Sequence, residues 1–328
     1  MTAPLTLAIP SKGRLQEQVE RYFADAGLAL VRSAGARDYR AALSGMADID
    51  VLLLSASEIA SALAVGDVHL GVTGEDLLRE TVPGLDGTVA LLQPLGFGFA
   101  DVAVAVPRAW IDVSTMADLD DVCTAYHARH HRRLRVATKY VTLTRAFFAR
   151  HGVSDYRIVE SSGATEGAPA AGTAEAIVDI TTTGATLAAN DLKPLDDGTI
   201  LKSQAQLAAS LKARWTKPVL AAAGRLLQRV AARETARGSH VLRVRIEKKA
   251  QDVLAALAEG AGCTVLTRPA KGNLAGGHAI LCPRDRLMDA VAILRARGVA
   301  APVTAQDADY VFADGNPVLG RLTAALKS

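Results

Sequence analysis

The feature that most constrains this chain is segment 177–187, where an apolar run leads into a turn of hydroxyl side chains and one glycine. The run from Ile177 to Ile180 predicts a buried strand. The threonine hydroxyls can donate hydrogen bonds, Gly184 permits a positive φ, and a following helix would direct free N–H groups at the same point. We therefore predict a phosphate site, made of Thr181, Thr182, Thr183, Gly184, Ala185 and Thr186.

Two acidic residues, Glu175 and Asp179, precede this turn. Carboxylates repel a phosphate but accept hydrogen bonds from sugar hydroxyls, and an acid that interrupts an apolar strand needs a partner. A phosphate cradle beside two such acids predicts a ribose 5-phosphate site. The competing interpretation is a threonine turn that only caps a helix.

Composition limits the classes of protein. With 328 residues, 50% hydrophobic and 22% charged, the chain predicts two or three domains. A net charge of +3 suits small anionic substrates, and with 4% aromatic residues we expect no nucleic-acid partner. The three cysteines are too few for a disulfide framework. With no apparent leader and no apolar run that could span a bilayer, we expect a cytoplasmic protein without a membrane partner.

Three histidines, His127, His130 and His131, stand close together among arginines. Neighbouring cations would repel a metal ion, so this segment predicts a solvated basic loop rather than a metal site.

The order of elements predicts an α/β fold. Strands at 5–10, 51–54 and 68–72 alternate with helices at 15–26 and 56–65, which is typical of a mostly parallel sheet that binds ligands at its carboxyl edge. A second sheet is expected from strands at 134–138, 157–160 and 177–180, with a helix at 142–151. We predict one lobe at 1–103 with 192–237, a second at 104–191, and a ferredoxin-like βαββαβ domain at 238–328.

Segment 160–179 resembles the signature of the ATP phosphoribosyltransferase family, the first enzyme of histidine biosynthesis. Three further motifs occur in the family's order, and the resemblance covers about the first 235 residues: IPSKGRL at 9–15, GVTGED at 71–76 and LRVATKY at 134–140. It implies a bilobal core like that of periplasmic binding proteins. It also implies transfer of the phosphoribosyl group of phosphoribosyl pyrophosphate (PRPP) to N1 of ATP, with release of pyrophosphate and with Mg²⁺ as cofactor.

Site roles follow from the matched motifs. Lys12 and Arg14 are the candidate catalytic cations, while Glu175, Asp179 and the turn at 181–186 would hold PRPP. Contacts to ATP or pyrophosphate are expected from Ser11, Gly13, Arg37, Arg40, Gly74 and Glu75. The family's usual arginine is replaced by Ser55, so a contact to ATP or pyrophosphate is either missing or supplied by Arg32, Arg37 or Arg40. No metal ligand is assigned.

The resemblance further implies a homo-oligomer, a dimer or a hexamer, in which the terminal domain binds histidine as an inhibitor. Segment 267–273 departs from the family's motif, which puts this regulation in question. Two alternatives remain open: another phosphoribosyltransferase, and a cytosolic bilobal solute-binding protein.

Overall fold

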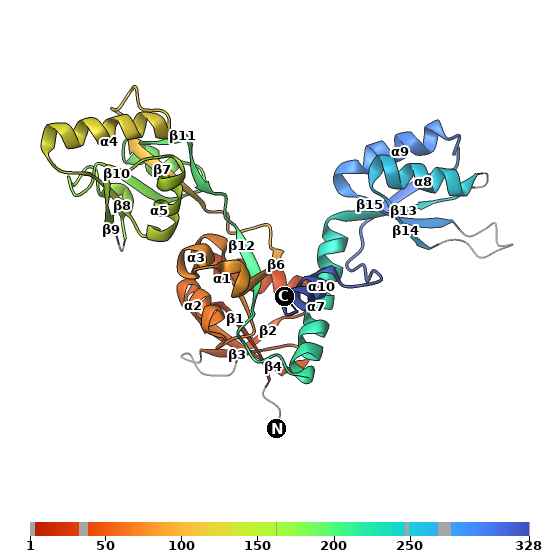
Figure 1. Ribbon diagram of the computed structural model, residues 1–328. Coiled ribbons are helices and arrows are strands. Elements are labelled where there is room, and N and C mark those ends of the chain that lie inside the picture. Colours follow the sequence, from red (N-terminus) through yellow and green to blue (C-terminus); the bar gives the residue numbers. More distant parts are fainter. Residues whose placement is uncertain (1–3, 33–38, 162, 247–248, 268–276, 328) are drawn as a thin grey trace.

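The computed structural model of the protein describes residues 4–32, 39–161, 163–246, 249–267 and 277–327. Its strands form three sheets, which build two lobes and a C-terminal domain (Figure 1). The bilobal, periplasmic-binding-protein-like core and the ferredoxin-like terminal domain are therefore as expected.

The first lobe contains a seven-stranded sheet in the order β2-β3-β4-β1-β5-β12-β6. Its strands are β1 (Leu5–Pro10), β2 (Leu30–Arg32), β3 (Arg40–Leu43), β4 (Met46–Leu54), β5 (Leu70–Gly74), β6 (Val89–Pro94) and β12 (Ala205–Ser210). β1 runs parallel to both β4 and β5, so the carboxyl ends of these three strands lie at one edge.

Helices cover both faces of this sheet because its central strand is apolar on both sides. Leu7 and Ile9 pack with α1 (Gly13–Asp25) and α7 (Lys217–Arg237), while Ala8 packs with α2 (Ala56–Val65) and α3 (Glu75–Thr81). A short 3₁₀ turn, η1 (Leu85–Gly87), precedes β6.

The second lobe contains a five-stranded sheet in the order β11-β7-β10-β8-β9. Its elements are β7 (Asp101–Pro107), α4 (Met116–His130), β8 (Leu134–Thr138), α5 (Val141–Arg150), β9 (Tyr156–Glu160), η2 (Thr165–Gly167), β10 (Ala176–Thr181), α6 (Ala185–Ala189) and β11 (Leu192–Leu201). β10 is parallel to β8, and β8 is parallel to β9. Helices α4 and α5 cover one face through Leu119, Phe147 and Phe148.

The lobes are linked by two chain crossings, between β6 and β7 and between β11 and β12. The crossings bond to each other: the Ala100 N–H donates to the Ser203 carbonyl (3.0 Å) and the Ala205 N–H to the Phe97 carbonyl (3.0 Å). The second crossing begins after Leu201, not before Leu192 as predicted. Leu192 and Leu195 are buried in the second lobe, which draws β11 into its sheet.

The C-terminal domain has the predicted βαββαβ order, with the sheet arranged β14-β15-β13-β16. Its elements are β13 (Ser239–Val244), α8 (Ala250–Ala261), β14 (Thr264–Thr267), β15 (His278–Pro283), η3 (Arg284–Arg286), α9 (Leu287–Ala296) and β16 (Val303–Gln306). Leu257 of α8 and Leu294 of α9 close its core. Figure 1 shows the long helix α7 leading from the first lobe to this domain.

A last helix, α10 (Pro317–Ala325), was not predicted and does not belong to the terminal domain. Val318 and Leu322 are buried in the core of the first lobe, beside Leu226 of α7. The Val311 N–H donates to the Ala232 carbonyl of α7 (3.0 Å), so the chain returns to the first lobe after β16. Sequence patterns had placed this whole segment in the terminal domain.

Other differences concern short or weakly patterned elements. The hairpin β2–β3 and strand β12 were not predicted, because β2 is short and β12 (AQLAAS) is rich in alanine and serine. The basic segment at 126–133 is largely the end of helix α4, where His131 takes the left-handed cap position. Cations there face the negative end of the helix dipole.

No helix of the described residues is both long and apolar enough to cross a membrane.

Candidate functional site

A pocket of about 430 Å³ opens at the carboxyl end of β10 in the second lobe. β8 and β10 are parallel neighbours, so the segments that follow them meet at one edge of the sheet. The pocket is lined by Lys139, Gly163, Ala164, Thr165, Glu166, Asp179, Ile180, Thr181, Thr182, Thr183, Gly184, Ala185 and Thr186. The structure therefore brings the predicted phosphate turn and Asp179 together in one cavity.

The turn owes its shape to Gly184, which has φ +74° at the start of α6. The Gly184 N–H donates to the Thr181 hydroxyl (2.9 Å), and the Ala185 N–H lies 3.4 Å from the Thr183 hydroxyl oxygen. Two N–H groups expected to point at a ligand thus already have acceptors. A hydroxyl that accepts still has its own proton to donate, so Thr181 and Thr183 remain donors toward the pocket.

Thr182 differs from its neighbours. Its hydroxyl donates to the Phe99 carbonyl (3.1 Å), on the crossing between β6 and β7. This bond attaches the turn to the crossing and occupies the only proton of that hydroxyl. Among the threonines of the predicted phosphate site, Thr182 is the one whose hydroxyl donates to the crossing, whereas those of Thr181 and Thr183 accept within the turn.

Asp179 lies partly buried on β10 with its carboxylate in the pocket. Burial raises the pKa of Asp179 above its ordinary value, against the opposing effects of the Ile180 N–H, Lys139 and Thr165; the Glu166 carboxylate raises it further. The Ile180 N–H donates to one carboxylate oxygen (2.8 Å), which leaves acceptor capacity on the other.

Lys139 and Glu166 also line the pocket, although sequence reasoning gave them no role there. The Lys139 ammonium lies 5.0 Å from the centre of the Tyr140 ring. The sequence could have predicted Lys139 as a pocket residue. Lys139 directly follows β8, and residues that follow neighbouring parallel strands lie at the same edge of the sheet. The pocket therefore holds one ammonium and two carboxylates beside its hydroxyl groups.

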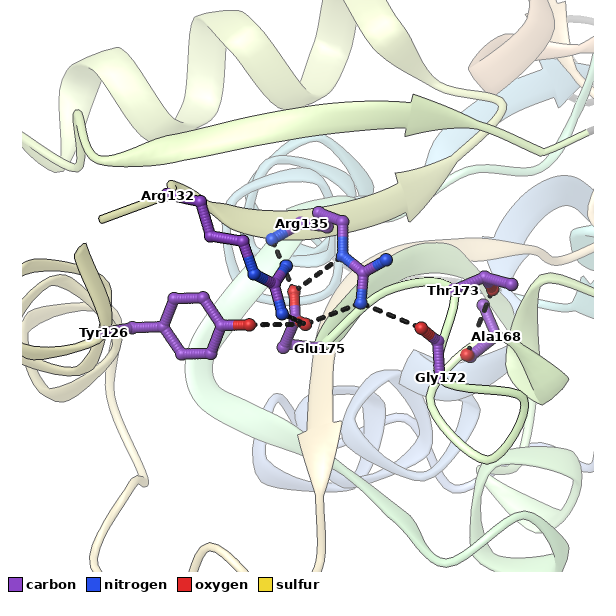
Figure 2. A network of polar contacts seen from close by, with 7 residues as sticks. All are labelled: Tyr126, Arg132, Arg135, Ala168, Gly172, Thr173 and Glu175. Carbon is purple, nitrogen blue, oxygen red and sulfur yellow. Dashed lines mark hydrogen bonds and ion pairs between the residues drawn. The ribbon is translucent and has the colours of Figure 1, made fainter. Parts of the chain in front are cut away.

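Glu175 does not line the pocket, contrary to the expectation that it binds the ribose. Figure 2 shows its carboxylate among Tyr126, Arg132 and Arg135. Its Oε1 accepts from Arg135 Nη2 (2.7 Å) and the Tyr126 hydroxyl (2.8 Å). Its Oε2 accepts from the Arg135 N–H (2.7 Å) and Nε (3.2 Å), and Arg132 adds an ion pair at 3.5 Å. The carboxylate precedes β10, at the opposite end of the strand from the threonine turn.

These contacts explain the acidity of Glu175. Burial favours the neutral acid, but the hydrogen bonds from Arg135 and Tyr126 outweigh it and lower the pKa to about 2. Arg135 Nη2 also donates to the Gly172 carbonyl (2.8 Å), so one guanidinium joins β8 to the loop before β10. Glu175 thus links α4 and β8 to the segment before β10 within the second lobe.

The predicted residues of the first lobe lie at the carboxyl edge of β1, β4 and β5. Lys12 and Arg14 are exposed beside Ser11 and Gly13 at the end of β1, and none of the four lines the pocket of the second lobe. Glu75 Oε1 accepts from Arg79 (2.7 Å) and its Oε2 from Gln206 (2.9 Å).

Two of the arginines proposed to replace the family's missing cation, Arg32 and Arg40, lie on the β2–β3 hairpin, where Arg32 is opposite Ala41 and Arg40 is opposite Leu52 of β4. Ser55 caps α2, accepting from the Glu58 N–H while the Glu58 carboxylate accepts from the Ser55 N–H. Arg32 pairs with Glu20, and Arg40 is exposed on β3. Arg37 lies outside the described residues.

No group of three or more histidine, cysteine or acidic side chains suited to a metal ion occurs in the described part of the chain. The three cysteines are buried free thiols. In the pocket at the end of β10, the acidic side chains available to a divalent cation are those of Asp179 and Glu166.

Comparison with known proteins identifies the family. The family model for ATP phosphoribosyltransferase matches residues 55–232. The ATP phosphoribosyltransferases of Rhodopseudomonas palustris (strain HaA2) and Nitrobacter hamburgensis are 54% and 55% identical over 328 residues, with both chains fully covered. A solved chain of the ATP phosphoribosyl transferase (HisG:HisZ) complex from Thermotoga maritima superposes with a TM-score of 0.52 at 25% identity, covering 69% of this chain and 98% of that chain. The chain therefore belongs to the ATP phosphoribosyltransferase family, the pentosyltransferases of the first step of histidine biosynthesis.

Proposed function

We propose that this protein transfers the phosphoribosyl group of PRPP to N1 of ATP, giving phosphoribosyl-ATP and pyrophosphate, and that PRPP occupies the pocket at the end of β10. The observation that carries the proposal is the combination of a threonine turn, an available carboxylate and a lysine in one cavity. Hydroxyl donors suit the 5-phosphate, the carboxylate suits the ribose hydroxyls, and the ammonium suits the pyrophosphate.

At the sugar end, the hydroxyls of Thr181, Thr183 and Thr186 donate to the 5-phosphate. The Gly184 and Ala185 N–H groups already have acceptors within the turn, so the backbone adds only the next N–H of α6, that of Thr186, which has no acceptor within its own helix. Asp179 accepts from the 2- and 3-hydroxyls. Glu175 is left out of this assignment because its oxygens already accept from Arg135 and Tyr126.

The residues present fit a magnesium ion that is held mainly by the substrate. Mg²⁺ retains several waters and binds through one or two carboxylates together with phosphate oxygens. Asp179 and Glu166 are the two acidic side chains in the pocket, and their mutual repulsion would be relieved by a cation. Bound there, Mg²⁺ would neutralise charge on the departing pyrophosphate.

ATP is assigned to the carboxyl edge of the first lobe. Lys12 and Arg14 provide exposed cations there, with Ser11 and Gly13 beside them and Gly74 and Glu75 at the end of β5. Because ring nitrogen N1 already carries a lone pair, no strong general base is required for its attack. The chain's contribution is to align N1 with the anomeric carbon and to stabilise the charge that develops on the leaving group.

The decisive experiment mixes the purified protein with PRPP and Mg²⁺, and adds either ATP or free purine and pyrimidine bases. We expect an ATP-dependent adduct absorbance with equimolar pyrophosphate. Adduct formation with a free base instead would favour another phosphoribosyltransferase. Ligand binding without pyrophosphate release would favour a solute-binding protein.

Assembly, regulation and location complete the proposal. The Thermotoga maritima relative belongs to a complex, and we propose a homo-oligomer for this chain, with histidine binding to the βαββαβ domain as an inhibitor. The three reduced thiols agree with a cytoplasmic location. Size-exclusion chromatography with light scattering would measure the oligomeric state.

A further inference from the structure

A buried polar cluster joins the two lobes beside the chain crossings. The Tyr140 hydroxyl, from the second lobe, donates to Asp76 Oδ2 (2.7 Å), and the Ser203 hydroxyl, from the second crossing, donates to Asp76 Oδ1 (2.9 Å). The Asp76 N–H in turn donates to the Ser203 oxygen (3.0 Å). Asp76 is 5% exposed, and Tyr140 and Ser203 are each 1% exposed. We call Asp76, Tyr140 and Ser203 the inter-lobe clamp.

A second carboxylate of α3 reinforces this contact. Glu80 accepts from the Thr142 N–H (2.8 Å) and the Leu143 N–H (3.0 Å), at the start of α5. These N–H groups have no acceptor within their own helix, and an acid is favourable at a helix N-terminus. Helix α3 of the first lobe therefore holds the turn between β8 and α5 of the second lobe at two points.

The clamp also explains why residue 74 is a glycine. A Cβ added at Gly74 would lie 2.2 Å from Asp76 Oδ1, a distance at which the carboxylate must move. Gly74 precedes α3 and has an ordinary φ of −68°. Glycine is needed here because a side chain would collide with the Asp76 carboxylate, not because of the backbone conformation. The GED motif at 74–76 therefore makes room for the clamp.

The turn that the clamp holds includes the pocket lysine. Lys139 stands between Thr138, whose hydroxyl accepts from the Tyr140 N–H (2.9 Å), and Tyr140, whose ring lies 5.0 Å from the ammonium. We propose that Asp76 and Tyr140 are positioning residues: their buried contact fixes the turn between β8 and α5 and thereby holds the Lys139 ammonium in the PRPP pocket. This inference rests on the proposed assignment of PRPP to that pocket.

The test separates this role from a contribution to folding alone. The variants are Tyr140→Phe and Asp76→Asn, each made in the wild-type chain and in Lys139→Ala. The control is Tyr156→Phe, which removes a hydroxyl from a ring that packs against Phe148 in the same lobe. KM for PRPP, KM for ATP, kcat and urea unfolding are measured for each variant.

We expect Tyr140→Phe to raise KM for PRPP about tenfold, because a displaced Lys139 ammonium loses its charge-assisted hydrogen bond to PRPP, and such a bond contributes about tenfold or more to binding. KM for ATP should change less than about twofold, and Tyr156→Phe should match the wild type. In the Lys139→Ala background Tyr140→Phe should add less than about twofold, because two residues that act through one interaction are not additive.

Full additivity with Lys139→Ala would overturn the proposal, as would equal rises in both KM values or normal kinetics in Tyr140→Phe and Asp76→Asn. If Tyr140→Phe does not fold, the milder Asp76→Asn decides by the same criteria. Product formation by the wild type is measured in the same assay. Its absence would refute the proposed function itself, whereas product with additive variants would refute only the positioning role.

Discussion

Substituting Glu175 by glutamine should weaken the second lobe while leaving PRPP binding nearly unchanged. The substitution keeps the size of the side chain but removes its charge. One carboxylate oxygen becomes an NH₂ group, which can no longer accept from Arg135 or Tyr126. Two guanidinium groups, Arg132 and Arg135, then lose the anion between them.

The magnitude follows from the carboxylate's acidity. Its pKa falls from an ordinary 4.5 to about 2. At about 1.4 kcal/mol for each tenfold change in the dissociation constant, this corresponds to an upper limit of about 3 kcal/mol. The side chains of Glu175 and Arg135 remain 15% and 28% exposed, so solvent screens part of the interaction. We expect a loss of about 1.5 to 2 kcal/mol in the free energy of unfolding of this lobe.

The chain offers a local reporter of this loss. Of its two tryptophans, Trp110 packs against the core of the second lobe and Trp215 against that of the first. In a Trp215→Phe background, urea unfolding followed by fluorescence therefore reports on the second lobe. Glu160→Gln, which neutralises an exposed acid in the same lobe, is the matched control and should unfold like its parent.

The stabilisation by Glu175 should depend on pH. Because the folded-state pKa of Glu175 lies below that of the unfolded chain, its stabilisation is complete above about pH 4.5 and is lost as the pH falls toward about 2. The difference between parent and Glu175→Gln should close over that interval. A stable variant with a raised KM for PRPP would contradict this reasoning and return Glu175 to the ribose site.

Three further outcomes are expected. Thr183→Val should raise KM for PRPP by about 10-fold to 150-fold, which corresponds to about 1.5 to 3 kcal/mol, and should leave KM for ATP nearly unchanged. Thr182→Val should raise KM for PRPP less, because its hydroxyl donates to a backbone carbonyl. Steady-state kinetics in which Thr183→Val raises both KM values equally would argue against the turn as the phosphate site. Asp179→Asn should weaken PRPP binding in a calorimetric titration without a change in urea midpoint, and normal affinity would make Asp179 structural. Histidine should inhibit the full chain, and inhibition should disappear when residues 239–307 are replaced by a short linker; the deletion must spare Val318, which is buried in the first lobe, and a full-length chain that binds no histidine would refute the regulatory role.

The sequence by itself determined the main architecture and the pocket at the threonine turn. The largely apolar runs Leu5–Pro10 and Leu134–Thr138 are the strands observed, because strands with both faces buried need mostly apolar residues. The terminal βαββαβ order could likewise be predicted from periodicity. The threonine turn and Asp179 lie within one strand and its following turn, so their proximity is local and is encoded by the order of residues alone.

Tertiary structure decided what depends on residues far apart in the chain. Glu175 and Asp179 look alike in sequence, but Glu175 bonds Arg135, forty positions away, whereas Asp179 faces the pocket. Helix α10 returns to the first lobe because that core accepts Val318 and Leu322. The clamp between Asp76 and Tyr140 joins residues from different lobes. Which of several partners a buried polar or apolar group meets is set by packing, and no local pattern of residues specifies it.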